Sequence, residues 1–170
     1  DTEDVWREQF AEAGGQYRDP TLVLFRGATR TACGQGQAAM GPFYCPGDQK
    51  LYLDTDFFDM MASRMGAGGD FAYAYVIAHE VGHHVQNLTG TLRETNRLRS
   101  QLGQADANRI SVLTELQADC YAGIWARQAQ QRFGTLEAGD LEEAMGAAQA
   151  VGDDVIQSNA GRTPMPDGET

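Results

Sequence analysis

The sequence predicts a single α+β domain that is predominantly helical, with a small β-sheet near its amino-terminal end. A chain of 170 residues has the usual length of one domain. Its 42% hydrophobic and 22% charged residues are ordinary for a globular protein with its own core. Runs of β-branched and aromatic residues lie between residues 21 and 53, and apolar residues recur at helical spacing from about residue 55 onward.

The first part of the chain alternates short elements with turns. Aromatic and aliphatic residues flank Pro46-Gly47-Asp48, which is a hairpin signal. Pro42 has no amide hydrogen, so we expect the first arm of this hairpin to be an edge strand. The predicted elements are an amphipathic helix over 4–13 with a linker to residue 20, a strand over 21–25, a turn-rich stretch over 27–40, and hairpin arms over 43–45 and 51–53.

The rest of the chain predicts five helices. Thr55 or Asp56 can cap the first of them, and the glycines that follow Met65 end it. The predicted helices cover residues 55–65, 70–88, 91–102, 105–133 and 137–157. Residues 158–170 are polar with two prolines, and we expect a flexible tail.

Composition excludes some function classes. The net charge of −11 leaves no basic surface for a phosphate backbone, so we expect no nucleic-acid partner. No apolar run approaches the roughly 20 residues of a membrane span. Cys33 and Cys45 can pair across a glycine-rich turn; the alternative is two free thiols in a reducing cell, and we favour the disulfide. We expect Cys120, inside a helical run, to be a buried thiol.

Residues 79–84, HEVGHH, contain all three histidines and the pattern H-E-x-x-H. Four residues advance a helix by about 400°, so His79 and His83 lie one turn apart on one face and can share a zinc ion. Glu80 is displaced about 100° around the helix, from where its carboxylate can act on a water without binding the metal. His84 cannot fully share this face, and we expect it to form hydrogen bonds or line a cleft.

A catalytic zinc ion needs a third protein ligand. Thr89 stands where a third histidine of the metzincin pattern would be, which leaves the downstream carboxylates. Glu94 lies on a charged helix and is expected to be solvated. Glu115 lies in an apolar run, ELQADCYAGIW, and Asp119 follows one turn later, where it can accept a hydrogen bond from a ligand histidine.

The stretches HEVGHHVQ and ELQADCYAGIWA resemble the bacterial neutral zinc metallopeptidase family, of the gluzincin type. CGQGQAAMGPFYCPGDQKLYLD, FAYAYVIAHEVGHHVQ and VGDDVIQ extend the resemblance over most of residues 33–157. It implies a zincin-like fold and one zinc ion per chain. The residue roles that it implies are zinc ligands at His79, His83 and Glu115, a general base at Glu80, and a hydrogen-bonding partner at Asp119.

The family typically has an amino-terminal membrane anchor, which this chain lacks, and a carboxyl-terminal continuation containing Thr-His-Gly. The resemblance therefore implies the cell envelope or the exterior of a bacterium. The predicted function is hydrolysis of peptide bonds, as an endopeptidase, through a zinc-activated water. Substrate backbone would pair with an edge strand formed by Met40, Gly41, Pro42 and Phe43.

Two alternatives remain open. One is a zinc-binding domain that no longer cleaves peptides and acts as a protein-interaction module. The other is a helical interaction domain without metal. The oxyanion-stabilising residue is left unassigned, because Tyr75 reads as a core residue and Tyr121 faces away from the predicted ligands.

Overall fold

The computed structural model describes residues 2–37, 41–64, 69–134 and 136–148, and it has the expected α+β architecture, mostly helical with a small sheet. The helices are α1 (Thr2–Glu12), α2 (Thr55–Arg64), α3 (Asp70–Leu88), α4 (Thr91–Gln101) and α5 (Gln104–Phe133), followed by a helix over residues 140–148. The strands are β1 (Thr21–Phe25), β2 (Ala28–Thr31), β3 (Gly34–Gln37), β4 (Phe43–Cys45) and β5 (Lys50–Asp54). Within these ranges, no helix combines the length and apolarity that crossing a membrane requires.

The main sheet has three strands in the order β1-β5-β4. β1 runs parallel to β5, with Thr21 opposite Lys50, and β4 runs antiparallel to β5, with Phe43 opposite Tyr52. The predicted hairpin is therefore present, and its first arm is an edge strand. β2 and β3 form a separate antiparallel pair.

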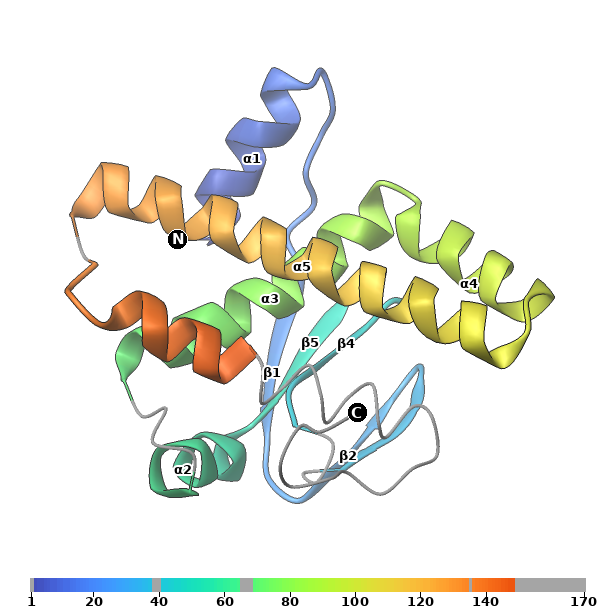
Figure 1. Cartoon of the computed structure of the whole chain (residues 1–170), viewed down its shortest axis with the longest axis horizontal. Coiled ribbons are helices and arrows are strands. Elements are labelled where there is room, and N and C mark those ends of the chain that lie inside the picture. The colour runs from blue at the N-terminus through green and yellow to red at the C-terminus, as the bar shows by residue number, and fades with distance from the viewer. Residues whose placement is uncertain (1, 38–40, 65–68, 135, 149–170) are drawn as a thin grey trace.

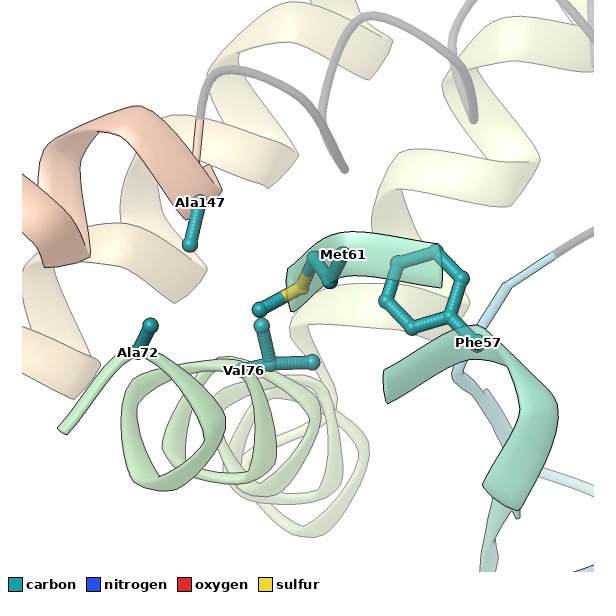
Figure 2. Close-up of a cluster of buried hydrophobic side chains, with 5 residues drawn as sticks. All are labelled: Phe57, Met61, Ala72, Val76 and Ala147. Carbon is teal, nitrogen blue, oxygen red and sulfur yellow. The ribbon is translucent and has the colours of Figure 1, made fainter. Parts of the chain in front are cut away.

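Helix α3 runs through the middle of the molecule (Figure 1). Three apolar clusters hold it there. One cluster, drawn in Figure 2, joins α2 and residue Ala147 to the first turns of α3. A second joins α3 to α1 and α5, and a third packs α3 against α1 and β5. The side chains of the first cluster are Phe57, Met61, Ala72, Val76 and Ala147. Because the clusters surround α3, its register relative to α5 and the sheet is fixed.

Helices α3 and α5 cross at very short range. A Cβ atom added to Gly82 of α3 would lie 2.9 Å from the carbonyl oxygen of Ala118 and 3.1 Å from its Cα. Real Cβ atoms essentially never approach another atom this closely. Glycine at this position therefore allows the backbone of α5 to lie directly on the helix that carries H-E-x-x-H.

The predicted disulfide is present between Cys33 and Cys45, with a Cα–Cα distance of 5.8 Å. Cys33 lies in the turn between β2 and β3, and Cys45 ends β4. The bond therefore attaches the small hairpin to the edge strand of the main sheet.

Several expectations need correction. The turn-rich stretch over 27–40 contains the β2–β3 hairpin, which its glycines concealed, and Cys120 is exposed because it lies on the outer face of α5. The last described helix begins at residue 140 rather than 137. Met40, Met65, residues 149–157 and the expected tail over 158–170 lie outside the described residues.

Candidate metal centre

Two helices bring three metal-binding side chains together. The Nε2 atoms of His79 and His83, both on α3, lie 3.1 and 3.3 Å from Oε2 of Glu115 on α5. The three donor atoms all lie within 4.8 Å of one another, and this is the one such group among the residues whose position the structure describes. Asp119 and Glu94 are not members of it.

The chemistry and spacing of these donors suit zinc. Ligand atoms about 2.0–2.2 Å from a zinc ion at the corners of a tetrahedron lie roughly 3.3–3.6 Å apart, close to the separations between Glu115 and the two imidazoles. Two nitrogen donors and one carboxylate are also the ligand set of catalytic zinc sites that leave the fourth position for water or substrate.

His79 is oriented by Asp119, as the resemblance implied. Its Nδ1 lies 2.8 Å from Oδ1 of Asp119, so an Nδ1 proton is donated there and the Nε2 lone pair is left for a metal ion. The hydroxyl of Tyr75 donates to the same carboxylate oxygen at 3.1 Å. Tyr75 lies one turn before His79 on α3. Its hydroxyl therefore fixes the Asp119 carboxylate that orients the His79 imidazole, so Tyr75 does more than pack in the core.

His83 has an orienting partner that sequence reasoning missed. Its Nδ1 lies 2.8 Å from Oε1 of Gln86, whose side chain is fully buried. The Gln86 amide in turn donates to the carbonyl oxygen of Thr114 and to Oε1 of Gln117, both on α5. The spacing of three residues between His83 and Gln86 on one helix face was the available signal.

The carboxylates around the two imidazoles favour positive charge in the site. Burial opposes protonation of His79, but hydrogen bonds to Asp119 and Glu115 outweigh it and raise the pKa of His79 to about 10. For Glu115, burial favours the neutral acid, but hydrogen bonds from the two imidazoles outweigh it and hold the pKa of its carboxyl well below the usual range. The site thus attracts a cation, and a metal ion would replace the protons that the imidazoles otherwise hold.

Glu80 lies inside the same cluster without being one of the three donors. It is 3% exposed, and its charge interacts with His83, His79 and Glu115. Burial raises the pKa of its carboxyl, and the neighbouring imidazoles partly offset this. Such a carboxyl has a raised affinity for a proton, which a general base requires.

His84 forms hydrogen bonds, as expected, and is fully buried. Its Nδ1 lies 2.7 Å from the Tyr44 hydroxyl and its Nε2 lies 2.6 Å from the carbonyl oxygen of Arg18. Asn87 donates to the same hydroxyl at 3.0 Å. These bonds attach the edge strand β4, which carries Tyr44, directly to the helix that carries the candidate ligands.

The remaining candidates are Glu94 and the expected substrate-binding segment. Glu94 is exposed and forms an ion pair with Arg97 on α4, as expected of a solvated carboxylate. Of the expected substrate-binding segment, Gly41 and Pro42 are buried and Phe43 begins β4, while Met40 is outside the described part of the chain.

Comparisons with known proteins agree with this geometry. The profile of a family described as "Putative neutral zinc metallopeptidase" matches residues 1–170. YpfJ of Escherichia coli K12 is 54% identical over 169 residues, which are 99% of this chain and 58% of that protein. Rv2575 of Mycobacterium tuberculosis is 48% identical over 158 residues, which are 86% of this chain and 52% of that protein. Both relatives are named as uncharacterised proteins, the chain spans little more than half of each, and no solved structure matches.

Proposed function

The chain belongs to the neutral zinc metallopeptidase family, and on this premise we propose that it hydrolyses peptide bonds as an endopeptidase with one zinc ion per chain. In this proposal His79, His83 and Glu115 hold the zinc ion in a gluzincin-type arrangement on a zincin-like fold. The observation that carries the proposal is the placement of two Nε2 atoms 3.1 and 3.3 Å from one carboxylate oxygen.

The protein residues divide the chemistry between them. A zinc ion bound there would polarise the scissile carbonyl and acidify a water molecule. Glu80 accepts the proton of that water and delivers it to the leaving amine, and burial favours this role by raising the pKa of its carboxyl. Asp119 and Gln86 keep the Nε2 atoms of the two imidazoles aimed at the metal position.

The substrate backbone pairs, in this proposal, with the free edge of β4 next to Gly41, Pro42 and Phe43. Among the described strands, β4 pairs with β5 alone, which would leave its other edge for an added strand. The bond between Tyr44 and His84 supports this placement because it fixes β4 relative to α3. The Cys33–Cys45 disulfide supports a location at the cell envelope or outside the cell, where such bonds persist.

The test compares zinc content and proteolysis on the same samples. We expect about one zinc ion per chain by elemental analysis and cleavage of casein that a chelator abolishes and added zinc restores. Glu80→Gln is the matched control, because it should keep the zinc ion and lose the cleavage. Absence of bound zinc after reconstitution, or equal cleavage by Glu80→Gln at equal zinc content, would refute the proposal.

One observation favours a second candidate, a zinc-binding module that does not cleave. The hydroxyl of Tyr75, one turn before His79, is bonded to Asp119 and so is not free to stabilise an oxyanion. A zinc-loaded protein that leaves casein intact would support this candidate.

A further inference from the structure

Helix α5 has an exposed apolar stripe. Val112, Leu113 and Leu116 are 40%, 62% and 56% exposed, respectively. Their spacing of three and four residues makes them neighbours on one side of the helix. Val112 and Leu116 lie closer around the helix to Glu115 than Leu113 does.

This stripe adjoins the candidate metal centre. On a helix surface, residues four apart form rows, and Glu115–Asp119 is the row that contacts the imidazoles of α3. The row on one side of it, Ala118–Ala122, is fully buried against α3 and the core. The row on its other side is Val112–Leu116, which is exposed; we call this pair the apolar wall.

Solvent reaches the site on α5 from the side of the wall. The side chain of Asp119 is 32% exposed, whereas that of His79 is 7% exposed. Since Ala118 is fully buried and Val112 and Leu116 are exposed, the open side of the Glu115–Asp119 row is the side that carries Val112 and Leu116.

We propose that the apolar wall contacts an apolar side chain of the peptide substrate close to the scissile bond, so that Val112 and Leu116 determine specificity. This inference rests on the proposed peptidase function. It requires a preference for leucine-like side chains over small polar ones at one substrate position. Removing a methylene-sized contact from an apolar substrate site costs about 10–200-fold in discrimination, and a wall open on one side belongs at the lower end.

A second copy of the chain fits the wall less well. Stable interfaces bury roughly 20–30 residues on each side, and the exposed stripe supplies three. The net charge of −11 also opposes association of the chain with itself.

The experiment uses internally quenched octapeptides in which leucine or serine occupies one position at a time. We expect the zinc-loaded protein to prefer leucine at one position, and Leu116→Gln with Val112→Thr to reduce that preference about 10-fold through kcat/KM. Leu113→Gln is the matched control, because Leu113 is equally exposed but turned about 160° around α5 from Glu115, and it should change nothing.

A binding measurement tests this inference independently of peptide cleavage. The same peptide sequences, each labelled with one fluorophore and no quencher, are titrated by fluorescence anisotropy into zinc-loaded Glu80→Gln, with and without the wall substitutions. A leucine preference that the wall substitutions weaken, and Leu113→Gln leaves intact, supports the wall even when no peptide is cleaved. Equal binding with and without the wall substitutions overturns it. A dimer in sedimentation velocity that Leu116→Gln dissociates would also overturn it, by assigning the stripe to self-association.

Discussion

Gly82→Ala is expected to damage the metal centre although it replaces no ligand. The added Cβ would lie 2.9 Å from the Ala118 carbonyl oxygen, and both groups belong to helix backbones that cannot rotate away. Helix α5 must therefore retreat from α3 by a few tenths of an ångström. Glu115 lies one turn before Ala118 on α5 and moves with it. Zinc–ligand distances tolerate changes of about 0.2 Å, so such a shift should weaken zinc binding by at least about 10-fold.

The effect on stability is the balance of two opposing contributions. Overpacking a close contact costs about 1–3 kcal/mol. Alanine is favoured over glycine inside a helix by about 0.8–1 kcal/mol. The free energy of unfolding without metal should therefore fall by about 0–2 kcal/mol. The helix preference of alanine does not offset the loss of zinc affinity.

Gly123→Ala is the matched control. Gly123 also lies inside a helix, but a Cβ atom there would have nothing within 4 Å. Gly123→Ala should therefore have a higher free energy of unfolding, because alanine is favoured over glycine inside a helix, and its zinc affinity should not change. Urea unfolding in a chelator gives the stability of each variant, and competition with a chromophoric chelator gives its zinc affinity. If Gly82→Ala matched Gly123→Ala in both measurements, the close helix crossing would not be what positions Glu115.

Three further predictions use the same assays. Glu80→Gln should retain zinc and lose at least about 10²-fold in kcat for casein or peptide hydrolysis, because the proton acceptor is gone; an equal loss of zinc would contradict this role. Asp119→Asn and Gln86→Leu should each weaken zinc binding about 10–100-fold, measured by chelator competition, because the first replaces the charged acceptor of His79 by a neutral amide oxygen and the second leaves His83 without its acceptor; unchanged affinity would show that the imidazoles need no such partner. Replacing Cys33 and Cys45 by serine should lower the free energy of unfolding by about 3 kcal/mol in urea without altering zinc affinity, since the loop between them closes 12 residues along the chain and neither contacts a ligand.

Sequence reasoning reached the helices and the strands of the main sheet because each has a local signal. Residues 70–88 and 21–25 match their predicted bounds, since a helical apolar pattern and a β-branched run are each read within a few residues. The parallel pairing of β1 with β5 could not be predicted, because it depends on contacts between residues almost thirty positions apart. The β2–β3 hairpin was missed because Gly-Gln-Gly-Gln has no β-branched or apolar residue.

For the candidate site too, the features that could be predicted are those with a local signal in the sequence. His79 and His83 could be paired from their spacing on one helix, and Glu115 could be favoured over Glu94 only by expecting that it would be buried. It is shielded for a different reason from the one expected. Its aliphatic neighbours Val112, Leu113 and Leu116 are exposed, whereas Ala118 and Ala122 on the side that meets α3 are buried.

What brings Glu115 to the imidazoles is a contact that no apolar pattern encodes. Gly82 lies between the two candidate ligand histidines along α3, and Ala118 lies between Glu115 and Ala122 on the side of α5 that meets it. Two residues with little or no side chain let the helices approach until carboxylate and imidazole are 3.1 Å apart. Gln86 then ties the same two helices together through the Thr114 carbonyl. Helix packing therefore sets the spacing of the three candidate ligands, which is why a methyl group at Gly82 should matter as much as a change of ligand partner.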